Sequence, residues 1–461
     1  MLTSRAWRRP ACMMKAVDNQ RSMSVHYVGF LRGHFGLAQA ARYAISALAS
    51  VNVGVKGHDI TSILPVPRGN YTVPTLPNDA VSPRVTIIAI NPPELSAGLL
   101  VLPKNVKDSY RIGCWYWEAP EIPEEWCDSF ALLNEVWAST TFVADAIRAK
   151  AMVPVAVIPF TVKIPSLEPD RSWLMKLVPG LAAEEFVFLF QFDALSVPFR
   201  KNPEGPIKAF VAAFAPNEAV HLVIKIQNSG SDPELMLRLK ALAKGFRVSF
   251  LESALDSNDR FRLLASIDCF VSLHRAEGLG LSIAEAMAYR KPVIVTAWSG
   301  NLDFTDTETA ALVDYDLFLT DQAYGPYPAG TSWAEPRIMH AARQMRRMLD
   351  DPIWRDDIAA AGQRRMSERF SEEKVGKIMR ARLERITTFH RAGVRYAHSA
   401  PRFNFRLIDL ILDVITDLGF YLSRILRMPQ LLFTLGPRKF LLRLHLALRH
   451  RISHIKRKAK S

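Results

Sequence analysis

The stretch that decides the fold runs from residue 277 to 296: Glu277-Gly278-Leu279-Gly280-Leu281-Ser282-Ile283-Ala284-Glu285, then Ala286-Met287-Ala288-Tyr289-Arg290-Lys291-Pro292-Val293-Ile294-Val295-Thr296. Its pattern predicts a glycine-rich loop, a helix over 282–289 and a buried strand over 292–296. The apolar run 269–273 just before it predicts another buried strand. A strand, a glycine loop, a helix and a strand in this order indicate a parallel α/β sheet.

The chemistry of this stretch suits a nucleotide sugar. Gly278 and Gly280 let backbone N–H groups approach a ligand closely, and the start of the following helix favours a diphosphate. Glu277 lies in the loop and Glu285 about one turn into the helix. Carboxylates accept hydrogen bonds from hydroxyl groups, so one glutamate can serve the sugar and the other the ribose. An ordinary turn with a capping glutamate is the alternative.

Strands and helices alternate through most of the chain, and the pattern restarts after a join at 163–179. We expect strands at 24–31, 85–90, 111–116, 135–138 and 155–159, and then at 186–192, 221–227, 247–251, 269–273 and 292–296. This predicts an α/β architecture of two Rossmann-like domains facing a central cleft. The expected divisions are a flexible leader (1–22), an N-terminal acceptor domain (23–170), a C-terminal nucleotide-sugar domain (171–350), helices packing back on the body (351–395) and a basic amphipathic tail (396–461).

Composition narrows the class of protein. The 461 residues are 49% hydrophobic, which excludes a wholly disordered or collagen-like chain. The four cysteines contain no CxxC pair, so neither a zinc knuckle nor a disulfide scaffold is indicated, and a reducing cytoplasm fits best. We expect no signal peptide and no membrane-spanning helix, because no apolar run is long enough.

The string 277–285, with its lead-in 268–275 and its continuation 296–301, resembles the Glu-x7-Glu signature of retaining glycosyltransferases with the GT-B fold, the large group 1 or family 4-like family. The resemblance covers about residues 24–385. It implies that Glu277 orients the donor sugar and Glu285 the ribose. It also places Gly278, Leu279, Gly280, Leu281 and His274 in the donor site.

A second segment, 193–203, resembles the part of this family that follows the first strand of the C-terminal domain. The resemblance implies that Lys201, with Arg200 beside it, stabilises the departing diphosphate. The family often has a Gly-Arg pair at the end of the preceding strand, whereas this chain has Phe190-Gln191. For Lys225, within the strand 221–227, a structural and a ligand-binding role remain equally open.

Three N-terminal loops complete the candidate site. Gly33, His34 and Gly36 lie in a loop that resembles the family's first-strand loop, which faces the donor and the acceptor; a plain turn is the alternative. Asn91 follows the strand 85–90 and would face the cleft, or form a proline-anchored turn. Glu118, within a tryptophan-rich segment, is a candidate contact for the acceptor or the donor sugar, or else a helix cap.

The resemblance implies transfer of a mannose- or glucose-like sugar, with retention, from an NDP-sugar to a glycan or lipid-linked acceptor, in cell-surface polysaccharide synthesis. We expect no cofactor and no metal, since no Asp-x-Asp motif stands in a suitable loop. A sugar-nucleotide epimerase of the same layout and a non-catalytic membrane-surface scaffold are the alternatives; the two glutamates favour transfer.

The tail is basic and amphipathic. Residues 401–461 contain 13 Lys and Arg and three Asp, so they hold +10 of the net charge of +14. Apolar stripes over 406–426 and 440–455 predict amphipathic helices. Such a tail suits an anionic membrane surface, which predicts a cytoplasmic protein peripheral to the inner face of the membrane. A partner protein is the alternative, and we do not expect nucleic acid to be the partner.

Overall fold

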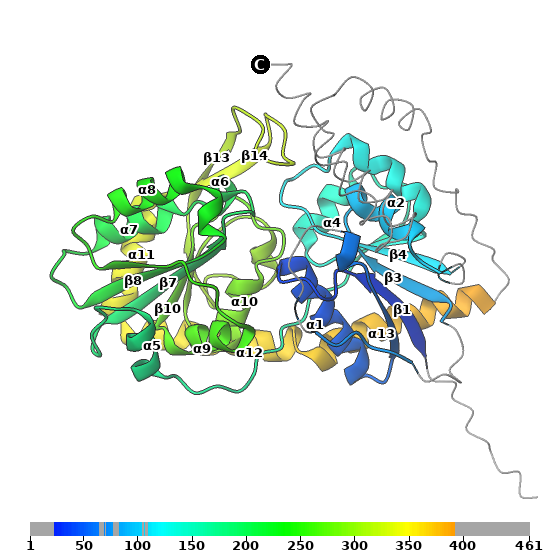
Figure 1. Ribbon diagram of the computed structural model, residues 1–461, viewed down its shortest axis with the longest axis horizontal. Coiled ribbons are helices and arrows are strands. Elements are labelled where there is room, and N and C mark those ends of the chain that lie inside the picture. Colours follow the sequence, from blue (N-terminus) through cyan, green and yellow to red (C-terminus); the bar gives the residue numbers. More distant parts are fainter. Residues whose placement is uncertain are drawn as a thin grey trace, which may run out of the picture.

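The computed structural model describes residues 23–63, 69, 71–76, 83–103, 106 and 109–391. Two parallel six-stranded sheets form two domains that lie side by side (Figure 1). This confirms the expected α/β class with two Rossmann-like domains. The predicted leader and tail lie outside the described residues. Within the described part, no helix is both long and apolar enough to cross a membrane.

The first sheet has the order β2-β1-β3-β4-β5-β6. Its strands are β1 (Ser24–Gly29), β2 (Gly54–Asp59), β3 (Val85–Ala89), β4 (Tyr110–Trp115), β5 (Glu135–Ala138) and β6 (Val155–Val157). The helices between them are α1 (Gly36–Ser50), α2 (Pro92–Leu100) and α4 (Thr141–Arg148), with 3-10 turns η1 (Thr61–Ile63) and η2 (Glu124–Leu132). Strand β1 ends two residues earlier than expected, and β2 was not predicted.

The second sheet has the order β12-β11-β10-β7-β8-β9. Its strands are β7 (Phe186–Asp193), β8 (Val220–Gln227), β9 (Val248–Leu251), β10 (Cys269–Ser272), β11 (Val293–Thr296) and β12 (Ala311–Val313). Its helices are α5 (Arg171–Leu177), α6 (Pro198–Lys201), α7 (Glu204–Ala213), α8 (Pro233–Leu242), α9 (Ser257–Ser266) and α10 (Leu281–Ala288), with η3 (Ser229–Ser231) and η4 (Gly300–Asp303).

A hairpin and three helices follow. The hairpin pairs β13 (Tyr315–Leu319) with β14 (Ser332–Pro336), and the helices are α11 (Ile338–Asp350), α12 (Pro352–Arg369) and α13 (Glu372–Arg391). Helices were expected over 351–395, and α12 and α13 are separated at Phe370, whose buried ring packs on Phe160 and Phe304. Helix α12 packs on α10, whereas α13 packs on α1 of the first domain (Figure 1). The chain thus ends its described part on the domain where it began.

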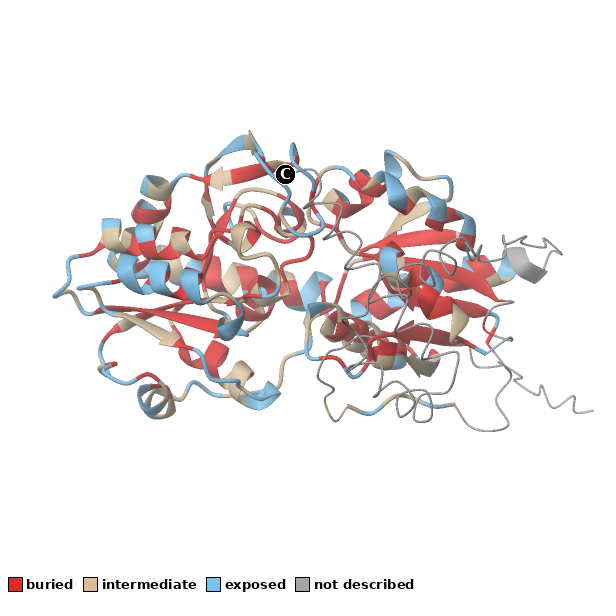
Figure 2. Cartoon of the chain, turned by 45° about the horizontal axis from the view of Figure 1, so that its top comes forward, coloured by how far each residue is buried: buried red, intermediate tan, exposed pale blue. Residues whose placement is uncertain are grey.

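Local sequence signals set the helix starts. Asp170, Asp232 and Asp351 each accept a hydrogen bond from a backbone N–H in the first turn of α5, α8 and α12. Proline occupies the first position of α8 and α12, where its missing N–H costs nothing. The inner strands β3, β5, β10 and β11 are buried along their whole length, as expected for parallel sheets covered by helices, whereas the edge strands β2, β6 and β9 are mostly half-buried (Figure 2).

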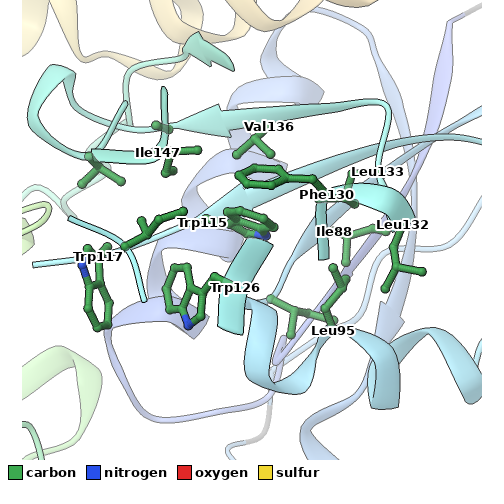
Figure 3. Packing of buried hydrophobic residues seen from close by; sticks show 14 of the residues in the cluster. Ile88, Leu95, Trp115, Trp117, Trp126, Phe130, Leu132, Leu133, Val136 and Ile147 are labelled. Carbon is green, nitrogen blue, oxygen red and sulfur yellow. The ribbon is translucent and has the colours of Figure 1, made fainter. Parts of the chain in front are cut away.

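The core of the first domain reaches into the second. Trp115, Trp126 and Phe130 pack together beside β4, with ring centroids 5.0–5.8 Å apart (Figure 3). The same buried cluster includes Tyr327 and Trp333, which belong to the segment carrying the β13–β14 hairpin. The two domains therefore share apolar packing close to the carboxyl ends of their strands.

Candidate active site

Each sheet has one point where the strand order reverses, and ligands of open α/β folds bind at such points. In the first sheet it lies between β1 and β3, and in the second between β7 and β10. His34 follows β1 and Asn91 follows β3, while Lys201 follows β7 and Glu277 follows β10. The topology thus brings four of the sequence-predicted residues to the two switch points.

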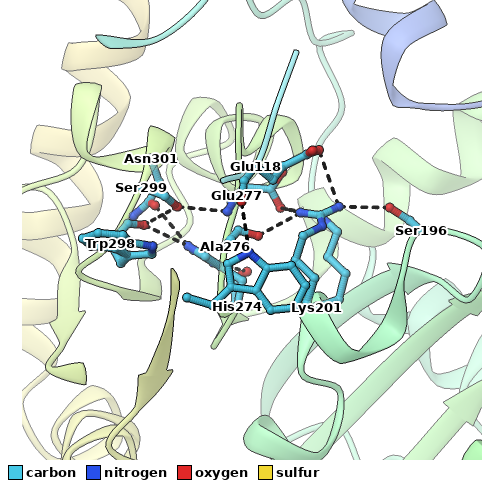
Figure 4. A network of polar contacts seen from close by, with 12 residues as sticks. Glu118, Ser196, Lys201, His274, Ala276, Glu277, Trp298, Ser299 and Asn301 are labelled. Carbon is cyan, nitrogen blue, oxygen red and sulfur yellow. Dashed lines mark hydrogen bonds and ion pairs between the residues drawn. The ribbon is translucent and has the colours of Figure 1, made fainter. Parts of the chain in front are cut away.

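Lys201 and Glu277 form an ion pair between the loops after β7 and β10 (Figure 4). Their side chains retain 20% and 12% exposure, so both are partly accessible. The backbone N–H of Glu277 donates to Ser299 Oγ at 2.9 Å, which ties the loop to the segment after β11. This pair joins the two residues that the sequence assigned to the donor diphosphate and sugar.

The electrostatics keep Glu277 charged. Burial alone would raise its pKa, but the nearby cations Lys201 and Arg200 lower the pKa of Glu277 to about 2. Burial lowers the pKa of Lys201, an effect that the attraction of Glu277 opposes. A carboxylate that never protonates near neutral pH can act as a hydrogen-bond acceptor for hydroxyl groups but not as a general acid.

Arg200 lies behind this pair and is only 3% exposed. Its Nη1 donates to the backbone oxygen of Ala276 at 2.8 Å, and its Nη2 donates to Ser196 Oγ at 3.1 Å. Arg200 nitrogens also lie 3.7 Å from Glu118 Oε1 and from Glu277 Oε2. Arg200 thus holds the loops together from within, while Lys201 is the more accessible of the two predicted cations.

The glycine-rich loop is packed against the first domain. A Cβ on Gly278 would lie 2.5 Å from the backbone oxygen of Trp117, and one on Gly300 would lie 2.2 Å from that of Gly278. Thr140 Oγ1, at the start of α4, donates to the Gly278 oxygen at 2.9 Å. Gly280 has φ +78° where α10 begins, a backbone conformation that favours glycine. Glycine is therefore required here by close backbone approach as well as by conformation.

Glu285 is buried and fully engaged by protein groups. Arg260 Nη1 donates to Glu285 Oε2 at 2.5 Å and its Nη2 donates to Oε1 at 3.2 Å. Tyr43 of α1 donates to Oε1 at 2.8 Å, across the domain boundary. Neither partner could be predicted from the sequence. Tyr43 and Arg260 lie on different helices, and no local sequence pattern indicates that either one contacts Glu285. A ligand hydroxyl at Glu285 has to share or displace these contacts.

The side chains of His274 and Lys225, two candidate donor-site residues, bind other protein groups. His274 is fully buried, where its ring nitrogens contact Ser272 Oγ at 3.0 Å and Asn301 Oδ1 at 3.1 Å. Burial lowers the pKa of His274, so it is a neutral brace for the loop after β11. Lys225 Nζ donates to the oxygen of Ile226 at 3.0 Å, and the structure does not join it to the Glu277 network.

The remaining donor-loop residues, Leu279 and Leu281, pack in or against the apolar cluster of the second domain.

The first-domain loops are held by polar contacts. His34 lies at the domain boundary, where its oxygen accepts from Gln227 of β8 at 3.5 Å. Asn91 Oδ1 accepts from the backbone N–H of Tyr116 at 2.9 Å and so fixes the segment after β4. Tyr116 was expected to be the last residue of this strand, but β4 ends at Trp115 and the backbone N–H of Tyr116 binds Asn91 instead. Gly33 has the ring of Phe35 against it, and Gly36 faces open space at the start of α1.

Glu118, in the loop after β4, faces the second domain. Tyr327 donates to its Oε2 at 2.5 Å, and Trp333 Nε1 donates to its backbone oxygen at 3.2 Å. Its side chain is 22% exposed. No sequence signal predicted the two aromatic partners.

Comparison with known proteins gives a match over part of the second domain. Residues 196–319 match the family model described as glycosyl transferases group 1. No curated protein matches the chain.

The fold is similar to solved glycosyltransferase structures. Sucrose-phosphate synthase from Thermosynechococcus elongatus has a TM-score of 0.58 at 15% identity, covering 79% of this chain and 99% of that one. Anabaena Alr3699/HepE, solved in complex with UDP-glucose, has a TM-score of 0.55 at 18% identity, covering 79% and 100%. A glycosyltransferase from Rickettsia africae has a TM-score of 0.53 at 11% identity, covering 79% and 99%. Residues 196–319 are thus similar to the group 1 glycosyltransferases, and the chain has the two-domain GT-B fold of the solved structures.

Proposed function

We propose that this protein transfers a glucose- or mannose-like sugar, with retention, from an NDP-sugar to a glycan or lipid-linked acceptor. The observation that carries the proposal is the Lys201–Glu277 pair, a partly accessible cation and carboxylate at the switch point of the second sheet. The lysine cation can form an ion pair with a diphosphate, and the carboxylate can accept hydrogen bonds from sugar hydroxyls. The solved Anabaena complexes with UDP and UDP-glucose favour a nucleotide sugar as donor.

In this proposal the ion pair opens when the donor binds. Lys201 exchanges Glu277 for the diphosphate and neutralises the charge that builds on the leaving group, a form of stabilisation on which enzymes depend heavily. Glu277, released from Lys201, accepts hydrogen bonds from the sugar, while Glu285 serves the ribose. Retention then follows from attack on the same face, with the leaving phosphate accepting the nucleophile's proton, so no enzyme nucleophile is needed.

The basic residues 401–461 support a cytoplasmic site at the inner face of the membrane. A role in cell-surface polysaccharide synthesis is what the resemblance to this family implies.

The test compares donor binding by the wild type and by Lys201→Ala, using UDP and GDP in calorimetric titrations. We expect Lys201→Ala to weaken binding about tenfold to a hundredfold, the range for a hydrogen bond to a charged group. Lys208→Ala is the matched control, because Lys208 lies exposed on α7 and, among the described residues, forms an ion pair only with Glu204. Unchanged affinity in Lys201→Ala contradicts the assignment.

A parallel assay asks whether a metal is needed. We expect hydrolysis of UDP-glucose or GDP-mannose to persist in excess EDTA. Loss of turnover in EDTA, restored by a divalent cation, contradicts a metal-free site.

A further inference from the structure

The β13–β14 hairpin belongs to neither six-stranded sheet. Its strands pair from Tyr315 with Pro336 to Leu319 with Ser332. In the segment between the strands, Tyr324 and Tyr327 form an antiparallel bridge. Figure 1 shows the hairpin at the top of the second domain, next to the first domain. Its end is therefore placed to contact the loop after β4.

Tyr327 packs between the first domain and its own hairpin. It is 4% exposed, and its ring centroid lies 4.7 Å from that of Trp117 and 5.1 Å from that of Trp333. Trp333 also donates to the backbone oxygen of Glu118 at 3.2 Å. The ring of Tyr327 and the indole of Trp333 thus hold the loop that carries Glu118.

The hydroxyl of Tyr327 begins a polar chain that ends at the donor site. It donates to Glu118 Oε2 at 2.5 Å, while Glu118 Oε1 lies 3.7 Å from Arg200 Nη2. Arg200 Nη1 in turn lies 3.7 Å from Glu277 Oε2. Burial and the nearby Glu118 raise the pKa of Tyr327 well above its ordinary value, so the hydroxyl keeps its proton and remains a donor.

The charges in this chain balance: the cations Arg200 and Lys201 face the carboxylates of Glu118 and Glu277. If Glu118 were free to turn away, the buried Arg200 guanidinium would have Glu277 as its only nearby carboxylate among the described residues. The position of Glu277 depends on how strongly Arg200 attracts it. When Glu118 is fixed beside Arg200, it therefore weakens the attraction of Arg200 for the Glu277 carboxylate.

We propose that Tyr327 is a positioning residue for sugar transfer. Its hydroxyl fixes the Glu118 carboxylate next to Arg200. Because Glu118 then balances part of the charge of Arg200, Glu277 remains available to Lys201 and to the donor sugar. This inference rests on the proposed function. It assigns to the hairpin a part in setting the geometry around the sugar, and it predicts an effect on turnover rather than on the affinity for the nucleotide.

The experiment uses the full chain and measures hydrolysis of UDP-glucose and GDP-mannose, together with UDP and GDP titrations. Tyr327→Phe removes only the hydroxyl and keeps the ring between Trp117 and Trp333. We expect kcat to fall about tenfold or more, since a hydrogen bond to a charged group is lost, with nucleotide affinity changed less than about twofold. Tyr324→Phe is the matched control, because in the described part of the chain its hydroxyl contacts only Gln322 and Asp321, both at the surface.

A double-mutant comparison separates positioning from a general structural role. If Tyr327 acts through Glu118, then Tyr327→Phe combined with Glu118→Gln is no slower than Glu118→Gln alone. Wild-type kcat in Tyr327→Phe, or multiplicative losses in the double variant, overturns the inference while leaving the proposed function standing. A wild type that binds neither UDP nor GDP and hydrolyses neither donor overturns the proposed function, and this inference with it.

Discussion

At the scale of single residues, the site is built from carboxylates held by arginines and tyrosines from both domains. Glu285 contacts Arg260 and Tyr43, and Glu118 contacts Tyr327 and Arg200. Both glutamates could be identified from the sequence, because Glu285 occurs in a compact motif with Glu277 and Glu118 lies in a tryptophan-rich segment. Their partners could not, since Tyr43 and Glu285 are 242 residues apart and meet only when both domains are folded.

The Glu285 contacts lead to a prediction that separates stability from function. Glu285→Gln leaves the Arg260 guanidinium without its charged partner, so we expect a loss of about 3 kcal/mol of stability and loss of transfer. The double variant Glu285→Gln with Arg260→Met should regain much of the stability, because neither charge remains buried, but not the transfer. Thermal unfolding and donor hydrolysis measure the two effects. Recovery of transfer in the double variant would show that Glu285 serves only to pair Arg260.

At the scale of elements, the glycine-rich loop between β10 and α10 is held in place by the loop after β4. The space at Gly278 is closed by the backbone of Trp117 on one side, and the backbone of Gly300 lies against Gly278. Backbone atoms cannot give way as a flexible side chain does.

Gly278→Ala should therefore push the two loops apart. We expect lower thermal stability, by about 1–3 kcal/mol, and a loss of donor hydrolysis, because the added methyl group overpacks the contact. Gly230→Ala is the control, since a Cβ there meets nothing within 4 Å. Equal unfolding temperatures for the two variants are incompatible with a tight contact at Gly278.

The paired strands β1 and β2 contain a second buried polar feature. His26 Nδ1 lies 2.9 Å from His58 Nε2, and His26 is fully buried. Burial, followed by the neighbouring His58 and Lys56, lowers the pKa of His26 to about 4 from 6.5. The unfolded chain therefore binds this proton more readily than the folded one between these two pH values.

We expect the free energy of unfolding to fall as the pH decreases from about 6.5 towards 4, because His26 must remain neutral in the folded protein. Above pH 6.5 this contribution is fully present. Denaturant unfolding at pH 7 and pH 5 measures the difference, with His26→Phe as the variant that cannot titrate. If His26→Phe loses as much stability between these pH values as the wild type does, another group is responsible.

The regular elements were largely predictable from the sequence, and the hairpin shows why the rest were not. Buried parallel strands such as β7, β8 and β11 are continuous apolar runs, so residues 186–192, 221–227 and 292–296 could be recognised within about a residue. Strands β13 and β14 lie in a segment rich in turn residues, and Trp333 of β14 packs in the apolar cluster of the other domain. Local pattern carries no information about such a partner.

At the scale of the whole molecule, the chain closes on itself through α13. Gly376 of this helix allows a close approach to α1, since a Cβ there would lie 2.2 Å from the oxygen of Ala47. Arg382 forms an ion pair with the buried Glu135 at 2.7 Å. Helix α13 is thus part of the first domain, although the whole second domain lies between them in the sequence.

Two truncations test this arrangement. Removing residues 401–461 should leave the unfolding temperature unchanged and abolish binding to anionic liposomes, with each Lys or Arg near such a surface worth about 1 kcal/mol. Removing residues 372–461 should give an unstable or aggregated protein, because four buried apolar side chains of α13, worth about 6–12 kcal/mol, leave the core. They are Val375, Met379, Leu383 and Ile386.

Co-sedimentation with liposomes at low and high salt, and thermal unfolding, measure these outcomes. If the protein lacking 401–461 still sediments with liposomes, the tail is not the anchor. If it aggregates, the apolar stripes of the tail belong to the folded body.

We propose that this protein transfers sugar with retention and that its Lys201–Glu277 pair opens for an NDP-sugar. The most direct measurement is a proton NMR time course of the purified full chain with UDP-glucose and, separately, GDP-mannose. The account predicts that one donor is consumed, that the first sugar product has the α configuration of the donor, and that Lys201→Ala slows its release. A first product of inverted configuration, or no consumption of either donor, would contradict it.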